Sequence, residues 1–190
     1  MPSHSQRPQG ERLAIGITGR IGAGKTSAGK HLAQKFGFQY LRYSQELSEW
    51  LAKDSENKSD LQEIGWKVMA SGLQAELNRR LIAQIMPHAD VAVDGLRHPI
   101  DSESLKNSFA SSFHLLYIDS PQKDRWERLK VQGKYPSLGS FEAVDSHPVE
   151  QRIELLRANA DLVLQNESSL QDLYLALDKA IQGFRGEGHA

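Results

Sequence analysis

The 190-residue sequence contains no cysteine, and this absence excludes several kinds of site at once. A disulfide framework, a thiolate zinc site and a cysteine nucleophile all require that side chain. An excess of basic residues is also missing, since 23 lysines and arginines stand against 24 acidic side chains and leave a formal net charge of −1. Proteins that hold nucleic acid through phosphate contacts usually carry a basic excess, so we expect no nucleic-acid partner.

Long hydrophobic runs are absent as well. No stretch approaches the roughly 18 apolar residues that a membrane helix requires, and the polar residues 1–12 lack the apolar segment of a secretory signal. We therefore expect a cytoplasmic protein without a membrane partner. The length and the hydrophobic fraction of 39% predict a single domain over 13–182, between a flexible leader at 1–12 and a flexible tail at 183–190.

Short apolar runs alternate with helical patterns along the chain. The apolar runs predict five strands, near 13–17, 38–43, 91–93, 113–118 and 161–165. Helical periodicity lies between and after them, at 25–35, from 44 onward, at 61–86 with a break near Gly72, at 121–132, at 149–158 and at 169–182. This alternation predicts an α/β fold in three layers, with a parallel five-stranded sheet that has helices on both faces and holds ligands at the carboxyl ends of its strands.

The most informative segment is the glycine-rich turn after the first predicted strand, which matches the P-loop pattern Gly-x4-Gly-Lys-Ser/Thr. Glycines let successive N–H groups point at phosphate oxygens, and the helix that follows presents its positive end to the same anion. Lys25 can bridge the β- and γ-phosphates of ATP, and the Thr26 hydroxyl can bind Mg²⁺. We predict an ATP site with Mg²⁺ as cofactor, formed by Gly19, Arg20, Ile21, Gly22, Ala23, Gly24, Lys25, Thr26 and Ser27.

Asp94 ends the third predicted strand, where a P-loop protein carries its Walker-B aspartate, so we predict that it holds Mg²⁺ partly through water. The segment 57–60 fits the guanine-reading pattern Asn-Lys-x-Asp, but it precedes this strand instead of following it. We interpret it as a solvated loop and exclude guanine specificity.

A helix with several basic residues follows the fourth predicted strand and leads into a stretch rich in glycine, proline and serine at 133–148. Arg125 and Arg128 lie on this helix. They could form an ordinary charged helix face, or they could belong to a mobile lid over about 120–148. Small phosphotransferases use arginines on such a lid to neutralise the phosphoryl group in transfer and to exclude water.

From about 13 to 182 the chain resembles the superfamily of P-loop nucleoside monophosphate kinases. The opening GITGRIGAGKT also resembles that of dephospho-coenzyme A kinases. Later segments are similar to archaeal adenylate-kinase-like proteins and phage deoxynucleotide kinases: VDGLR at 93–97, LYIDSP at 116–121 with RWERL at 125–129, FEAVD at 141–145 and ADLVLQN at 160–166. The P-loop is the most specific of these motifs, and the others gain weight from their order and spacing.

The resemblance implies a role for each matching residue. Arg97 would hold the phosphate of the acceptor, Ser44 would line the acceptor pocket within a helical region over about 44–86, and Asn166 would begin the loop that holds adenine. Arg125 and Arg128 would act as lid arginines near ATP. The acceptor helix lacks the arginine that usually ends its opening pattern, so Arg42, Arg79 or Arg80 would have to substitute, and Arg152 or Arg157 could add a transfer arginine.

These observations predict phosphoryl transfer from MgATP to a small phosphorylated acceptor, most simply a nucleoside or deoxynucleoside monophosphate. Lys25, Asp94, Arg125 and Arg128 are the predicted catalytic residues, and Arg42, Ser44 and Arg97 the predicted acceptor-binding residues.

Two alternatives stay open. One is a kinase for another small metabolite, such as dephospho-coenzyme A, with Asp94 as the base. The other is a nucleotide-binding regulator without transfer activity. The identity of the acceptor and the oligomeric state are not predicted.

Overall fold

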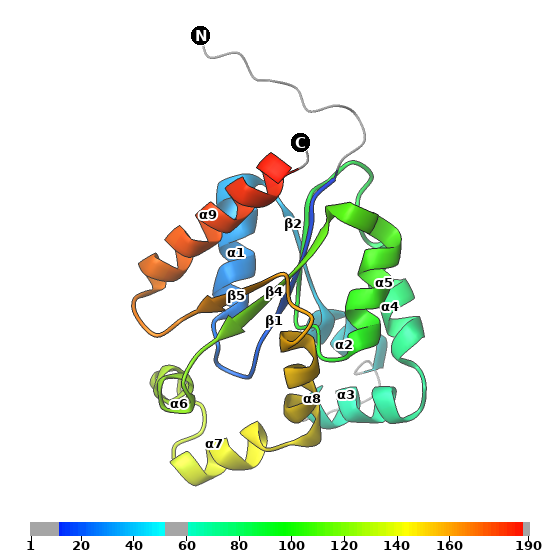
Figure 1. The fold of residues 1–190 in the computed structure, drawn as a ribbon. Coiled ribbons are helices and arrows are strands. Elements are labelled where there is room, and N and C mark those ends of the chain that lie inside the picture. The colour runs from blue at the N-terminus through cyan, green and yellow to red at the C-terminus, as the bar shows by residue number, and fades with distance from the viewer. Residues whose placement is uncertain (1–11, 52–60, 188–190) are drawn as a thin grey trace.

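A parallel sheet forms the centre of the molecule in the computed structural model, which describes residues 12–51 and 61–187 (Figure 1). Its strands are β1 (Ala14–Thr18), β2 (Gln39–Arg42), β3 (Val91–Asp94), β4 (Phe113–Asp119) and β5 (Leu162–Gln165), in the order β2-β3-β1-β4-β5. All four strand pairs are parallel. The predicted five-stranded parallel sheet is confirmed, whereas the loop predicted at 54–60 and residues 1–11 of the predicted leader lie outside the described residues.

Two hydrophobic cores lie on opposite faces of this sheet. Ile15 and Ile17 of β1 pack into one core with α1 (Lys25–Phe36) and α9 (Leu170–Glu187). Ala14 of the same strand packs into the other core, with helices at 43–51, 74–83, 99–109 and 148–157. Because successive side chains of a strand point to opposite faces, the apolar run of β1 serves both cores, as expected for a sheet covered on both faces.

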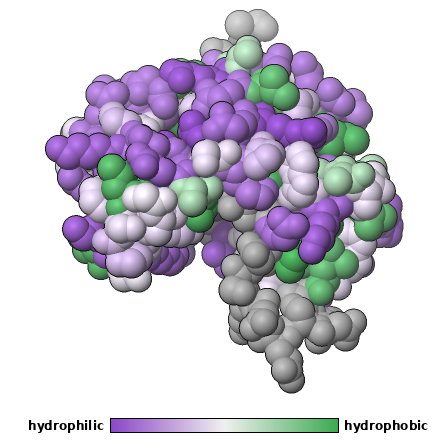
Figure 2. Space-filling model, turned by 90° about the horizontal axis from the view of Figure 1, so that it is seen from below, coloured by the Kyte–Doolittle hydropathy of each residue, from purple (hydrophilic) through white to green (hydrophobic). Residues whose placement is uncertain are grey.

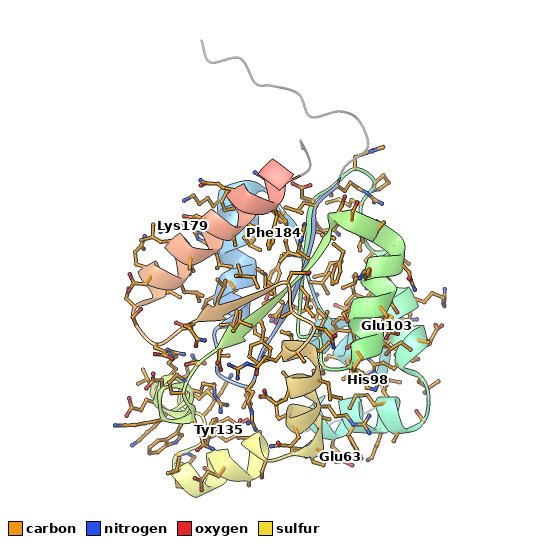
Figure 3. The ribbon with its side chains drawn as sticks, in the orientation of Figure 1. Glu63, His98, Glu103, Tyr135, Lys179 and Phe184 are labelled. Carbon is orange, nitrogen blue, oxygen red and sulfur yellow. The ribbon has the colours of Figure 1, made fainter. Side chains whose placement is uncertain are left out.

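Four helices of the second face follow β2 and β3 in the chain. They are α2 (Tyr43–Leu51), α3 (Leu61–Ala70), α4 (Gln74–Ala83) and α5 (Pro99–Phe109), which a short 3-10 turn (Ala110–Ser112) connects to β4. The predicted break near Gly72 separates α3 from α4, where Gly72 has a φ of 77°. No helix was predicted at 99–109. Its start is defined by His98 (Figure 3), whose side chain accepts a backbone hydrogen bond from Ile100 and forms a capping box with Asp101.

The region after β4 contains α6 (Gln122–Val131), α7 (Leu138–Asp145) and α8 (Pro148–Arg157). No helix was predicted within the glycine-, proline- and serine-containing stretch 133–148, yet Ser137 caps a short helix over 138–145 and Phe141 anchors it in the interior with no exposed surface. The prediction of a flexible tail from 183 is wrong for 183–187, since α9 continues to Glu187 and Phe184 packs against the core.

Figure 2 shows the face that carries α3 and α6 to α8, on which hydrophilic residues predominate and hydrophobic residues occur in small separate groups. Among the described residues, no helix combines the length and the apolar character that would be needed to cross a bilayer.

Candidate active site

The P-loop connects β1 to α1. Its path brings the backbone close to neighbouring groups at two glycines, Gly19 and Gly24. Gly19 has a φ of 139°, and a Cβ at this position would lie 2.3 Å from the carbonyl oxygen of Ile118. Gly24 has a φ of 107°, and its Cβ would lie 2.6 Å from the amide nitrogen of Asn166. A larger side chain at either position would push the loop off β4 or off the β5–α9 connection, so both glycines are required by sterics.

Lys25 lies over this loop. Its Nζ donates hydrogen bonds to the carbonyl oxygens of Gly19, at 2.6 Å, and Arg20, at 2.9 Å. Burial lowers the pKa of the Lys25 ammonium group, and the carboxylates of Glu150 and Asp94 oppose that shift. The geometry therefore places a cation at the mouth of the loop with anionic groups close to it, as phosphate recognition by a P-loop requires.

The two predicted metal ligands lie next to each other. The Thr26 hydroxyl donates a hydrogen bond of 3.1 Å to Oδ2 of Asp94, which stands at the carboxyl end of β3. Hydroxyl and carboxylate oxygens are the donors that Mg²⁺ prefers, so this pair fits the predicted ion. The Tyr40 hydroxyl donates to the same Asp94 oxygen at 2.8 Å. Sequence reasoning missed Tyr40.

A cavity of about 240 Å³ opens beside the P-loop. Arg97 and Ser44, both predicted from the sequence, belong to its wall together with Lys25, Thr26 and Asp94. The wall also contains apolar side chains and two polar ones, mainly from α2, α3, α4 and α8: Leu47, Met69, Leu77, Val149, Gln74 and Asp101. The structure thus brings part of the predicted ATP site, with Asp94, and two of the three predicted acceptor-binding residues to one cavity.

Arg97 is held by a carboxylate that sequence reasoning did not find. Its Nη1 donates to Oε1 of Glu150 at 2.6 Å, and Oε2 of Glu150 accepts the backbone N–H of Ile21 in the P-loop at 2.9 Å. The Glu150 side chain is 0% exposed, whereas that of Arg97 is 32% exposed. Glu150 therefore links the P-loop to the acceptor-side arginine from the first turn of α8. Tyr135 lies between α6 and α7 (Figure 3). Burial raises the pKa of the Tyr135 hydroxyl, and the negative charge of Glu150 raises it further.

The turn that carries Arg97 is fixed by Asp101. One Asp101 oxygen accepts the backbone N–H groups of Arg97 and His98, each at 3.0 Å, and the other accepts the amide of Gln74 at 2.6 Å. Burial raises the pKa of Asp101, and these hydrogen bonds oppose the shift. Asp101 thus binds the backbone N–H of Arg97, whereas Glu150 binds its guanidinium group.

Arg125 is buried instead of displayed on a lid. Its guanidinium group forms a bidentate pair with Asp145 of α7 and also donates to the carbonyl oxygen of Ile21 at 3.0 Å. The Arg125 side chain is 4% exposed. Burial alone would raise the pKa of Asp145, but hydrogen bonds and charge from Arg125, with the charge of Arg20, lower it below the usual range. Arg125 thus connects α6 and α7 to the P-loop, and a mobile lid over 120–148 stays a prediction.

Arg128 and Asn166 lie on the side of the P-loop away from the cavity. Arg128 donates to the Ser120 hydroxyl at 2.8 Å and to the carbonyl oxygen of Asn166 at 2.7 Å. The Asn166 side chain is buried and donates to the carbonyl oxygen of Ala23 at 2.8 Å. This side chain therefore supports the P-loop from the β5–α9 connection, and a role in holding adenine stays a prediction.

The structure does not bring the other candidate arginines to the cavity wall. Arg42 contacts Gln45, at the exposed start of α2. The remaining four are engaged elsewhere in the described residues: Arg79 with Glu76, Arg80 with Glu46, Arg152 over the Trp66 ring and Arg157 with Asp119. In this geometry Arg97 is the predicted acceptor-side arginine that reaches the cavity. Ser27 follows Thr26 in the first turn of α1.

Comparison with known proteins relates the whole chain to small P-loop kinases, although no family model matches it. It is 21% identical to the shikimate kinase of Buchnera aphidicola over 180 residues, which cover 92% of this chain and 99% of that protein. It is 24% identical to the shikimate kinase of Persephonella marina over 154 residues, 80% of this chain and 88% of the relative.

The solved structure of the shikimate kinase from Acinetobacter baumannii in complex with shikimate has the same fold. It matches with a TM-score of 0.59 at 18% identity and covers 94% of this chain and 96% of that one. The parallel sheet, the P-loop and these nearly full-length matches support the predicted superfamily of P-loop kinases and, with it, an ATP-dependent kinase as the class of enzyme.

Proposed function

We propose that the protein transfers the terminal phosphoryl group of ATP to the phosphate of a nucleoside or deoxynucleoside monophosphate. The observation that carries the proposal is the lining of the cavity beside the P-loop. It combines Arg97, Lys25 and Asp94 with several apolar side chains and the amide of Gln74.

The charged residues of the lining fit an anionic acceptor. Arg97 leaves the end of β3 three residues after Asp94, on the acceptor side of the P-loop. Its guanidinium group can bind a phosphate with two parallel hydrogen bonds, which a lysine cannot reproduce. An acceptor phosphate bound there would face the terminal phosphoryl group of an ATP molecule whose phosphates lie in the P-loop.

The rest of the lining fits a flat, mainly apolar group with polar edges. Leu47, Met69 and Leu77 supply apolar surface from three different helices. Gln74, whose amide also donates to the buried Asp101, supplies a polar group among them. A nucleobase has apolar faces and polar edges, so this combination supports a nucleotide over a small polyol.

The chemistry needs no covalent intermediate. The terminal phosphoanhydride bond of ATP breaks, and a new phosphoanhydride forms between its γ-phosphorus and an oxygen of the acceptor phosphate. That oxygen is already ionised at neutral pH, so no general base is required, and catalysis rests on positioning and on charge stabilisation by Lys25 and Arg97. Thr26 and Asp94 would hold Mg²⁺, which neutralises charge on the phosphates when bound.

A second candidate is a kinase for a hydroxyl acceptor. The observation that favours it is the match to shikimate kinases over most of their length. In that reaction the acceptor hydroxyl must lose a proton, and Asp94 at the cavity wall would be the base. Transfer to dephospho-coenzyme A belongs to the same class, and a regulator without transfer activity would show no turnover with any acceptor.

A coupled ADP-release assay separates these candidates. The purified protein is given ATP and Mg²⁺ with each ribo- and deoxyribonucleoside monophosphate, dephospho-coenzyme A or shikimate in turn, and Lys25→Ala serves as the background control. The proposal expects saturable turnover with one or a few monophosphates. Turnover confined to shikimate or dephospho-coenzyme A would replace it with the second candidate.

A further inference from the structure

Tyr40 connects the middle of β2 to the predicted metal ligands. Its hydroxyl donates a hydrogen bond of 2.8 Å to Oδ2 of Asp94 on the neighbouring strand β3. The Thr26 hydroxyl donates to that same oxygen at 3.1 Å. Two donors from different elements, β2 and α1, thus converge on one carboxylate oxygen and fix the rotation of the Asp94 carboxylate.

The ring of Tyr40 is itself held in place by a close packing contact. A Cβ built on Gly29 would lie 2.2 Å from Cε2 of Tyr40. The ring therefore lies directly against the backbone of α1, at the position where any larger residue would displace it. Because α1 also carries Thr26, this contact fixes the distance between the helix and the end of β3.

We propose that Tyr40 is a positioning residue of the Mg²⁺–ATP site, which acts by orienting the Asp94 carboxylate toward the ion. This inference rests on the proposed function, since it assigns Asp94 and Thr26 to the ion that accompanies ATP. Removal of a residue that hydrogen-bonds to a metal-ligating side chain, without touching the metal, typically lowers metal affinity by about 10- to 100-fold. Tyr40 touches neither substrate in this role.

The test is the Mg²⁺ dependence of ATP binding, measured by calorimetry without an acceptor, so that no turnover is involved. Tyr40→Phe removes the hydroxyl and keeps the ring on Gly29. We expect the gain in ATP affinity on adding Mg²⁺ to fall by about tenfold, with metal-free ATP affinity and melting temperature close to those of the wild type. Tyr117→Phe is the matched control, because its hydroxyl is bound to Glu154 at 3.0 Å, away from Asp94.

A double variant tests whether Tyr40 acts through Asp94. In an Asp94→Asn background, Tyr40→Phe should cause no further loss of the Mg²⁺-dependent gain, because the carboxylate that it orients is absent. An equal loss in both backgrounds would overturn the inference.

The outcomes also separate this inference from the proposed function. A wild-type protein whose ATP affinity gains nothing from Mg²⁺ would overturn both. A wild type with a clear gain, together with an equal gain in Tyr40→Phe, would overturn the role of Tyr40 alone and leave the kinase proposal standing.

Discussion

Glu150 and Arg97 form an ion pair, with 2.6 Å between Oε1 and Nη1, and the second oxygen of the same carboxylate binds the P-loop amide of Ile21 at 2.9 Å. A phosphate oxygen makes the same kind of hydrogen bonds with guanidinium and backbone N–H donors. Under the proposed function, the Glu150 carboxylate would compete with a substrate phosphate for the Arg97 guanidinium group and the Ile21 N–H.

Replacing Glu150 with glutamine should strengthen acceptor binding. Glutamine retains a hydrogen-bond acceptor but removes the charge that neutralises Arg97, so the KM for a monophosphate should fall by about fivefold, equivalent to about 1 kcal/mol. Steady-state kinetics with saturating ATP measures this change. Glu154→Gln, one turn further along α8, should leave the KM unchanged. A higher KM in Glu150→Gln would mean that the carboxylate aligns Arg97 for the acceptor instead of competing with it.

Replacing Arg97 with lysine should weaken the acceptor site selectively. A lysine cannot form the two parallel hydrogen bonds to one phosphate, so the acceptor KM should rise, or turnover should fall, by about tenfold or more. ATP affinity, titrated without acceptor, should stay within about twofold because P-loop contacts are unchanged. Arg79→Lys, on the exposed side of α4, is the control. Equal weakening for ATP and acceptor would remove Arg97 from the acceptor site.

Lys25→Ala should abolish transfer and leave the fold intact. The variant loses the cation that stabilises the migrating phosphoryl group, which typically costs about 100- to 1,000-fold in rate. The variant keeps Gly19 and Gly24, whose close contacts set the path of the loop, so circular dichroism and melting temperature should change little. Activity within a few fold of the wild type would contradict the assignment of the P-loop.

The buried pair of Arg125 and Asp145 should make stability depend on pH. The pKa of Asp145 is lowered in the folded state, so its contribution is present above the unfolded-state pKa of about 3.9 and is lost as the pH falls through the lower folded-state pKa. Asp145→Asn should lower the free energy of unfolding by about 3 kcal/mol at neutral pH.

Urea unfolding over a pH series measures this effect. The difference between wild type and Asp145→Asn should shrink as the pH falls below about 4, whereas Glu127→Gln, exposed on α6, should behave like the wild type throughout. A difference that stays constant down to the lowest pH at which the protein folds would show that Asp145 stabilises the fold without its charge.

The parts of the site that sequence predicted are those encoded within short segments. The P-loop is contiguous from Gly19 to Thr26, and each residue type has a local reason to be there. Asp94 and Arg97 follow from their distance to the end of one buried strand. The sheet was predictable for the same reason, since buried parallel strands form continuous apolar runs.

The missing parts depend on contacts between distant segments. Glu150 is 129 residues from Ile21, and only the packing of α8 against the P-loop brings them together. Tyr40 reaches Asp94 because β2 lies beside β3, and the order of strands in the sheet is not encoded by any single segment. The helix α7 was missed because its eight residues contain a glycine and only three strongly apolar side chains, Leu138, Phe141 and Val144.

The central claim concerns which bond the protein forms, and phosphorus NMR of the reaction product measures it directly. ATP and Mg²⁺ are incubated with the acceptor that gives turnover, and the product spectrum is compared with that of the Lys25→Ala variant. The account predicts a new phosphoanhydride, seen as coupled α- and β-phosphorus signals of a nucleoside diphosphate that derives from the monophosphate. A new phosphomonoester signal on an acceptor hydroxyl would contradict it.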